Sequence, residues 1–237
     1  MRAKTLLRSA FKRVGYDLVR HRPNLHDFLT VRSIDTIIDV GANDGAFAHQ
    51  ARDRGYTGSI ISFEPIREVY ARLQDGFSND PLWKGYNLGV SNECGEAVIG
   101  VSELSVFSSM HKLKTQASKF DERSRFVRSE TIKITTLDAL SGEIDGSKIL
   151  LKLDTQGHEQ ACLEGIGQLE KRVEGIHMEL PLSSLYDNVW SFHEAIGFMK
   201  QIGFIPCIFS PVNYHEIDPM AMVEVDCTFR RHIHNYD

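Results

Sequence analysis

The stretch Thr36-Ile37-Ile38-Asp39-Val40-Gly41-Ala42-Asn43-Asp44-Gly45 decides how the rest of the chain is interpreted. A run of β-branched apolar residues ends near Asp39 and breaks into a loop with glycines at positions 41 and 45. This pattern is typical of a buried parallel strand that delivers its C-terminal end to a ligand. Gly41 permits a tight turn, and Gly45 permits a following helix to start close to the bound group. The sequence therefore predicts an α/β protein built around this strand.

The segments beside this stretch alternate between helix and strand patterns. The first half predicts helices at 25–31, 46–54 and 66–74 and strands at 59–65 and 86–90. Further strands at 97–101 and 131–137 enclose a polar stretch, 102–129, which we interpret as a lid because so long a connection in a compact domain is usually functional. The alternation resumes with strands at 148–154, 175–180, 203–209 and 223–229 and helices at 158–169 and 189–202.

Length and composition predict one large globular domain. The chain has 237 residues, of which 42% are hydrophobic and 25% charged. We divide it into a basic segment, 1–24, and a domain, 25–237, with the lid insertion at 97–135. Three of the four cysteines, Cys162, Cys207 and Cys227, fall inside predicted elements, so we expect core residues in a reducing, cytoplasmic compartment. We expect neither a membrane-spanning segment nor a signal peptide.

Charge is distributed unevenly along the chain. Residues 1–22 carry seven basic residues and one acid, a net charge of +6. Because the whole chain is −5, the remainder carries −11. An acidic body argues against nucleic-acid binding, which needs a basic face on the domain itself.

The basic residues near the N-terminus belong to an amphipathic pattern. Residues 3–14 place apolar side chains at helical spacing, with basic side chains between them. One interpretation is a short helix packed on the side of the domain. The other is a peripheral contact, through residues 2–20, with the anionic inner face of a membrane.

Carboxylates follow several of the predicted strands. Asp39, Glu64, Asp154 and Glu179 lie at or near strand ends, where an open parallel sheet binds its ligand. An acid in the position of Glu64 accepts the ribose hydroxyls of an adenosine. A pyrophosphate at the first loop would be repelled by the acids, and the loop lacks the G-x-G-x-x-G pattern. A cationic cofactor without phosphate, S-adenosylmethionine, fits better. The candidate cofactor-binding residues are Asp39, Gly41, Ala42, Asn43, Asp44, Gly45, Glu64, Pro65, Leu88 and Gly89.

Several motifs together resemble the FkbM-type methyltransferases, within the class I S-adenosylmethionine-dependent enzymes. They are Ile38–Gly45, Phe63-Glu64-Pro65, Leu137-Asp138, Leu151–Glu159 and Gly203-Phe204, and the resemblance covers about residues 36–231. It implies a Rossmann-like fold with a mostly parallel seven-stranded sheet and helices on both faces. It also implies methyl transfer to a hydroxyl, often on a sugar of a glycolipid, cell-surface glycan or natural product. Gln156 and His158 depart from the residues common in relatives.

The candidate catalytic residues are Asp154, His158, Glu159 and Glu179. A carboxylate or histidine that accepts the proton of a sugar hydroxyl accelerates transfer by roughly 10²–10⁴-fold. Asp154 is the first candidate for this base, and His158, at a helix N-terminus that favours neutral imidazole, is the rival. A divalent ion on Asp154 with Glu159 or Glu179 is a further option. No dedicated metal motif is present, so we predict no metal.

Two alternative functions remain at this point. One is an NAD-dependent oxidoreductase on a related sheet, which the acid-lined loop disfavours. The other is a non-catalytic scaffold that keeps the fold and the cofactor site. The predicted function is an S-adenosylmethionine-dependent O-methyltransferase with a glycosyl-containing acceptor.

Overall fold

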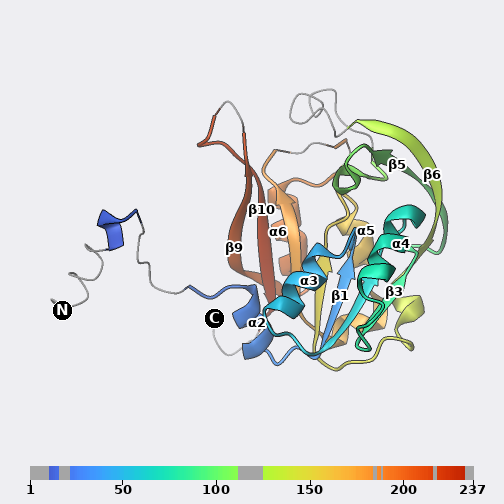
Figure 1. The fold of residues 1–237 in the computed structure, drawn as a ribbon, viewed down its shortest axis with the longest axis horizontal. Coiled ribbons are helices and arrows are strands. Elements are labelled where there is room, and N and C mark those ends of the chain that lie inside the picture. Colours follow the sequence, from blue (N-terminus) through green and yellow to red (C-terminus); the bar gives the residue numbers. More distant parts are fainter. Residues whose placement is uncertain are drawn as a thin grey trace.

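The computed structural model describes residues 11–15, 22–111, 125–183, 186–187, 189–215 and 218–232. Its centre is a seven-stranded sheet in the order β3-β2-β1-β7-β8-β10-β9. Strands β1, β3, β9 and β10 of this sheet are labelled in Figure 1. The strands are β1 Thr36–Val40, β2 Ser59–Phe63, β3 Trp83–Tyr86, β7 Ile149–Leu153, β8 Val173–Pro181, β9 Phe204–Tyr214 and β10 Met222–Arg231. Only β10 runs antiparallel to its neighbours, β8 and β9. The predicted α/β fold, mostly parallel with one antiparallel strand near the C-terminus, is confirmed.

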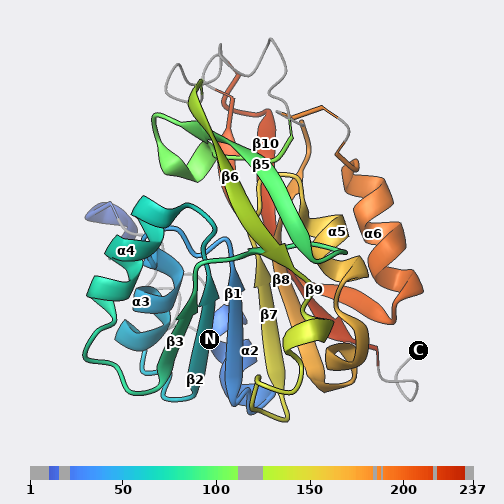
Figure 2. The ribbon, with the colours of Figure 1, turned by 90° about the vertical axis from the view of Figure 1, so that its right-hand side faces the viewer.

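Helices cover both faces of this sheet. They are α2 Leu25–Val31, α3 Ala46–Asp53, α4 Arg67–Gly76, α5 Glu159–Glu164 and α6 Phe192–Gln201, with 3₁₀ turns η1 Ser105–Phe107, η4 Asp138–Leu140 and η5 Gly167–Arg172. Helices α2, α3 and α4 contribute apolar side chains to one core cluster, and α5 and α6 contribute to the other. The sheet lies between these two layers (Figure 2).

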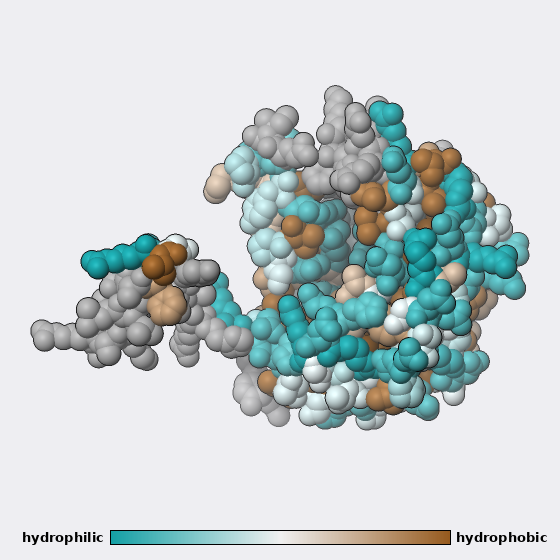
Figure 3. Space-filling model, in the orientation of Figure 1, coloured by the Kyte–Doolittle hydropathy of each residue, from teal (hydrophilic) through white to brown (hydrophobic). Residues whose placement is uncertain are grey.

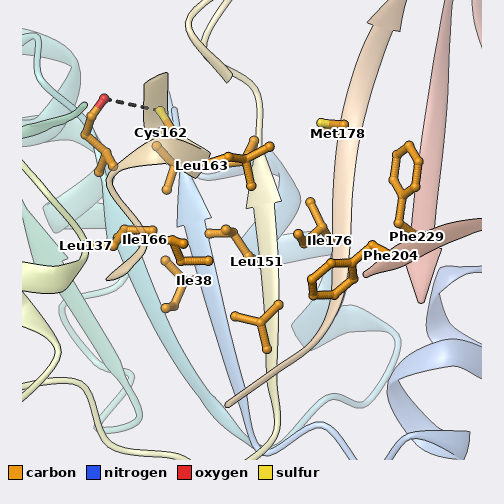
Figure 4. Close-up of a cluster of buried hydrophobic side chains, with 14 of the residues drawn as sticks. Ile38, Leu137, Leu151, Cys162, Leu163, Ile166, Ile176, Met178, Phe204 and Phe229 are labelled. Carbon is orange, nitrogen blue, oxygen red and sulfur yellow. Dashed lines mark hydrogen bonds between the residues drawn. The ribbon is translucent and has the colours of Figure 1, made fainter. Parts of the chain in front are cut away.

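Strand register explains why the core is continuous. Ile38, Leu151, Ile176 and Phe229 lie side by side across β1, β7, β8 and β10, and all four are fully buried. Figure 4 shows this row with the side chains packed above it. The neighbouring positions in β1 and β7 point to the opposite face and are buried as well. Apolar residues at consecutive positions are therefore required, because central parallel strands are covered on both sides.

A second, three-stranded sheet lies beyond the upper ends of the central strands. It consists of β4 Gly89–Val90, β6 Phe126–Thr135 and β5 Gly95–Ser102, in that order. The prediction of one strand at 86–90 was wrong, because the chain leaves the main sheet after Tyr86 and enters the second sheet at Gly89. The predicted polar lid also differs from a simple loop, since its last residues belong to β6, which pairs with β5. Residues 112–124 of it lie outside the described residues.

Three other predictions need correction. The helix expected at 158–169 ends at Glu164, and the 3₁₀ turn η5 follows it. The helix expected from residue 189 begins only at Phe192, because Ser191 forms a capping box with Glu194. Cys207 is exposed on the edge strand β9, so it is not a core residue, whereas Cys162 and Cys227 are buried.

The N-terminal segment is described only in part. Of the helix expected at 3–14, residues 11–13 are helical, and residues 11–15 are all exposed. Val14 lies in a turn, and residues 3–10 of the predicted helix lie outside the described residues. Among the described helices, none is long and apolar enough to cross a membrane.

Candidate active site

A cavity of about 380 Å³ lies at the carboxyl ends of β1, β2, β7 and β8. Its lining begins with the turn after β1 and the end of β2, continues along the turn after β7, and reaches β8, β9 and β10. Residues from η1 and β5 line the side away from the sheet. The surface seen in Figure 3 is mainly hydrophilic, with small and separate hydrophobic patches. Because the cavity lies at the carboxyl ends of these strands, it occupies the edge of the sheet that the sequence predicted for the ligand.

The turn after β1 is constrained at Gly41. Its φ is +73°, and a Cβ there would lie 1.9 Å from the carbonyl oxygen of Asp154. The ends of β1 and β7 thus approach too closely for any side chain. Gly41, Ala42, Asn43 and Asp44 line the cavity.

Gly45 is also constrained by its packing against α4. It does not belong to the residues that line the main cavity. Its φ is +89°, and a Cβ would lie 2.6 Å from the ring of Phe77 and 2.8 Å from Leu73 of α4. Gly45 therefore makes room for a neighbouring helix, while α3 starts directly after it.

Glu64 is held rigidly at the end of β2. Its Oε2 accepts a hydrogen bond from the backbone N–H of Asn43 at 3.0 Å, and its Oε1 accepts one from Ile66 at 2.8 Å. The residue is 5% exposed and lines the cavity beside Pro65. Burial raises the pKa of Glu64 to about 7, although the two backbone donors act in the opposite direction. The carboxyl is thus both a brace for the glycine turn and a group that faces the cavity.

Lys152 is the residue at the centre of the site that the sequence analysis did not single out. Its Nζ lies 2.9 Å from Asp39 Oδ1 and 3.6 Å from Asp154 Oδ2, and it donates to the carbonyl oxygen of Gly41 at 3.0 Å. The same ammonium lies 5.5 Å from the ring centroid of Phe47. Burial lowers the pKa of Lys152, but the charges of Asp39 and Asp154 outweigh it and hold the pKa above its ordinary value.

This ion pair changes the electrostatic picture of the site. Asp39 is completely buried and is not part of the cavity lining, so its charge is offset inside the sheet. Asp39 and Lys152 are register neighbours in β1 and β7, which explains why they meet. Lys152 therefore partly neutralises the acids at the sheet edge. The sequence-based expectation of carboxylates at the strand ends did not include this positive charge.

Asp154 is the carboxylate that faces the cavity from β7. Its side chain is 43% exposed, and its Oδ1 accepts a hydrogen bond from the amide of Gln156 at 2.9 Å. Gln156 in turn accepts from the Tyr186 hydroxyl at 3.0 Å. Asp154 is thus oriented by Lys152 on one side and by Gln156 on the other, while its charge remains accessible to a ligand.

Glu159 is occupied by the turn that follows β7. Its Oε1 accepts hydrogen bonds from the backbone N–H groups of Thr155 and Gly157 and from the Thr155 hydroxyl, at 2.9, 3.2 and 3.0 Å. The residue is 4% exposed and does not line the main cavity. It holds the turn that carries Asp154 and Gln156.

His158 belongs to a chain of polar side chains outside the main cavity lining. Its Nδ1 lies 3.3 Å from Nε2 of His111, and its Nε2 lies 3.0 Å from the hydroxyl of Ser91. Burial, and then the neighbouring His111, lower the pKa of His158 to about 4. The imidazole is therefore neutral at pH 7, but both ring nitrogens already face polar neighbours.

Two serines connect the second sheet and η1 to the cofactor side of the cavity. The Ser105 hydroxyl donates to Oδ1 of Asn43 at 2.9 Å. The Ser109 hydroxyl donates to the backbone oxygen of Gln156 at 2.7 Å. The segment predicted as a lid thus contacts the turns after both β1 and β7.

A second group of carboxyls lies at the far end of the cavity. Glu179 of β8 faces Asp226 of β10 in register, and Glu224, two residues earlier, points to the same face. Asn213 of β9 donates to Oε2 of Glu224 at 2.8 Å. Glu224 and Asp226 were not among the candidate site residues, because only the long-range pairing of β10 with β8 places them beside Glu179.

Among the described residues, no group of three or more histidine, cysteine, aspartate or glutamate side chains could hold a metal ion. Leu88, which lies between β3 and β4, and Gly89, the first residue of β4, also line the cavity. The structure therefore brings the first loop, Glu64, Leu88 and Asp154 around one cavity, with Glu179 at its far end.

The sheet order, the single antiparallel strand and the glycine turn with an acid after β2 define a Rossmann-like class I methyltransferase, which uses S-adenosylmethionine. The chain belongs to the family described as the methyltransferase FkbM domain, whose model matches residues 39–206. The resemblance inferred from the motifs is confirmed. Among proteins with curated functions, none matches the chain.

Solved structures with a similar fold include methyltransferases of several kinds. TehB from Haemophilus influenzae is 8% identical with a TM-score of 0.49, covering 94% of this chain and 66% of that one. An rRNA methylase from Streptococcus thermophilus is 12% identical with a TM-score of 0.46, covering 91% and 100%. Precorrin-6y C5,15-methyltransferase from Geobacter metallireducens is 9% identical with a TM-score of 0.46, covering 87% of both chains.

Proposed function

We propose that this protein is an O-methyltransferase that acts on a sugar hydroxyl of a glycolipid, a cell-surface glycan or a glycosylated natural product. The observation that carries the proposal is the position of Asp154. It is a half-exposed carboxylate, fixed by Lys152 and Gln156, in the same cavity as the adenosine-type acid Glu64. A hydroxyl acceptor needs such a proton acceptor beside the methyl donor.

The cofactor half of the cavity suits S-adenosylmethionine. The turn after β1 leaves no room for a side chain at Gly41, so backbone lies directly at the cavity wall. We assign Glu64 to the ribose hydroxyls, with Gly41–Asp44, Pro65, Leu88 and Gly89 around the nucleoside. When bound, S-adenosylmethionine supplies an electrophilic methyl group on a sulfonium.

The role of Asp154 is to orient the acceptor and to take its proton. One carboxylate oxygen is held by the amide of Gln156, which leaves the rest of the carboxylate for an acceptor hydroxyl. Lys152 keeps this carboxylate in place and compensates its charge. Much of the acceleration in such a displacement comes from positioning, and the base adds roughly 10²–10⁴-fold.

The described parts of the predicted lid, residues 97–111 and 125–135, complete the proposed enzyme as a cover over the cofactor. Its hydrogen bonds through Ser105 and Ser109 reach both turns that frame the cavity. Water exclusion by such a cover strengthens the electrostatic interactions inside.

The function is tested by mass spectrometry of glycolipid and glycan extracts incubated with the protein and S-adenosylmethionine. We expect a product heavier by one CH₂ group on a sugar. Asp154→Asn should lose roughly 10²–10⁴-fold of this activity and keep its affinity for S-adenosylhomocysteine. His158→Asn serves as the matched comparison, and we expect it to lose far less. Absence of any methylated glycan product with the wild-type protein would contradict the proposal.

Calorimetry distinguishes the cofactor from the alternative nucleotide. S-Adenosylhomocysteine should bind and NAD should not, because Asp44 lines the first turn, where the pyrophosphate would lie. Binding of NAD alone would overturn the assignment of the cavity. Binding of S-adenosylhomocysteine without turnover on any acceptor would favour the scaffold alternative.

A further inference from the structure

The far end of the main cavity is formed by carboxyl groups that no cofactor role explains. Glu179, Glu224 and Asp226 line it, together with Asp154. Burial, followed by the charge of Glu224, raises the pKa of Glu179 to about 10, and burial raises the pKa of Glu224 as well. Glu179 is therefore protonated at neutral pH, and its carboxyl can donate a hydrogen bond.

The remaining groups at this end leave it negatively charged. Burial, and then the charge of Asp154, raise the pKa of Asp226 only to about 6, so it is largely ionised at pH 7. Lys152 is committed to Asp39 and Asp154. Burial, and then the charge of Lys152, lower the pKa of His177 to about 4, so this imidazole is neutral. Lys152, which also acts on Asp226, is the one lysine or arginine among the described residues of the lining, so the acidic side chains there outnumber it.

An independent feature also points to a polar ligand at this end of the cavity. A side cavity of about 30 Å³ shares Gln156, Glu179 and Glu224 with the main cavity and is also lined by Trp190. Trp190 is 7% exposed, and its indole Nε1 is buried without an acceptor among the described residues. A buried N–H donor normally has a partner. The side cavity has room for one hydroxyl-sized group, with Trp190 as donor and the carboxyl pair as donor and acceptor.

We propose that Glu179, Glu224, Asp226 and Trp190 form the acceptor subsite, which selects uncharged or amine-bearing polyols and rejects acceptors that carry a carboxylate or a phosphate. This inference rests on the proposed function and adds a substrate class to it. A protonated Glu179 can donate a hydrogen bond and the neighbouring carboxyl oxygens can accept one, as a sugar hydroxyl requires. The net negative charge repels an anionic group placed beside it.

Three matched probes test the charge selectivity on the full chain loaded with S-adenosylhomocysteine. They are methyl glucoside, its uronic acid analogue with a carboxylate, and its 2-amino analogue with an ammonium group. Calorimetry or ligand-observed NMR gives the three dissociation constants. We expect the neutral and cationic probes to bind at least about tenfold more tightly than the anionic one. Equal or tighter binding of the uronic acid, or binding of none of the probes, would overturn the inference.

Glu224→Gln identifies the residues responsible. It replaces an ionisable carboxyl with a neutral amide of the same size, and it preserves an oxygen for Asn213. We expect the discrimination against the uronic acid to shrink by about tenfold. Glu174→Gln is the matched control, since Glu174 lies on β8, the strand of Glu179, but at the opposite end of that strand from the cavity. Unchanged discrimination in Glu224→Gln, or an equal change in Glu174→Gln, refutes the assignment.

Trp190→Phe tests the donor independently. The ring is replaced by another aromatic that can still pack against Phe198, whose centroid lies 5.7 Å away. Because Nε1 has no partner among the described residues, we expect binding of methyl glucoside to weaken by at least about fivefold. Unchanged affinity would contradict the subsite.

Binding and turnover separate this inference from the proposed function. A glycoside that binds with the expected charge preference but is not methylated by S-adenosylmethionine would refute the O-methyltransferase proposal alone. Methylation of glycosides with no preference against the carboxylate would refute the subsite alone.

Discussion

Replacing Lys152 with methionine is expected to destabilise the fold strongly at pH 7 and much less at pH 5. The ammonium lies 2.9 Å from Asp39 inside the sheet, where Asp39 is completely buried. Methionine keeps most of the side-chain volume but removes the charge. Asp39 is then left as a buried carboxylate without a counter-ion, which is among the most costly arrangements in a protein interior.

The magnitude follows from the least costly response of the folded protein, which is to protonate Asp39. Keeping a carboxyl protonated costs about 1.4 kcal/mol of free energy for each pH unit above its ordinary pKa of about 3.9. The loss of stability is therefore about 4 kcal/mol at pH 7 and about 1.5 kcal/mol at pH 5. The sign is that of a carboxyl whose folded-state pKa lies above its unfolded value, so stability is lost as pH rises.

Urea denaturation of wild type and Lys152→Met at pH 5, 6 and 7 measures this difference. The double variant Asp39→Asn/Lys152→Met is the control, because it removes both charges and should show no such dependence on pH. A penalty below about 1 kcal/mol at pH 7 would mean that the ion pair contributes little, as exposed pairs do. A penalty of the same size at all three pH values would mean that Asp39 does not take up the proton.

Three further predictions concern the turns and the N-terminal segment. Gly41→Ala should cost more than about 1–2 kcal/mol, the strain of a left-handed residue alone, because its Cβ also meets the backbone of Asp154; thermal unfolding measures this. Glu159→Ala leaves three hydrogen-bond donors of the turn after β7 without an acceptor, so we expect the free energy of unfolding to fall by at least about 2 kcal/mol. Urea denaturation measures this, and an unchanged midpoint would contradict the role of Glu159 in holding the turn. Deletion of residues 2–20 should abolish co-sedimentation with anionic liposomes, whereas unchanged binding would remove the membrane interpretation.

The main sheet could be predicted because its central strands carry a strong local signal. The apolar runs of β1 and β7 each end in a turn that begins within one residue of the predicted end. The short strands β3 and β4 could not be separated, because only the long-range pairing of Gly89 with Ile134 shows that the chain has changed sheets. Length and local composition contain no information about that partner.

The site was predicted where a residue lies at a strand end and missed where it depends on register. Glu64 and Asp154 follow their strands directly and were found. Asp39 lies two residues before Gly41, and Lys152 lies two residues before Asp154. Aligning the ends of β1 and β7 would therefore have paired Asp39 with Lys152. To predict Glu224 as a site residue, one would have to know that β10 lies beside β8, and no local sequence pattern shows this.

The buried position of Glu64 leads to a prediction about pH. Burial raises its pKa to about 7 in the protein without ligand. The proposed bonds from two ribose hydroxyls need the ionised carboxylate, because a protonated carboxyl accepts less well. Only the ionised fraction is then competent to bind, so the affinity for S-adenosylhomocysteine should rise between pH 6 and pH 8 and level off above it. At pH 6 we expect it to be about tenfold weaker than on the plateau.

Glu64→Gln separates this effect from the ionisation of the ligand itself. The amide keeps the size of the side chain and one acceptor oxygen but cannot titrate, so its affinity should be lower at pH 8 and nearly constant from pH 6 to pH 8. Calorimetry at three pH values in buffers of matched ionic strength provides the measurement. If the wild-type profile is flat while Glu64→Gln still binds weakly, the carboxylate is ionised well below pH 7, and the backbone N–H groups of Asn43 and Ile66 outweigh burial. If both proteins bind equally well at pH 8, Glu64 braces the glycine turn but does not bind the ribose.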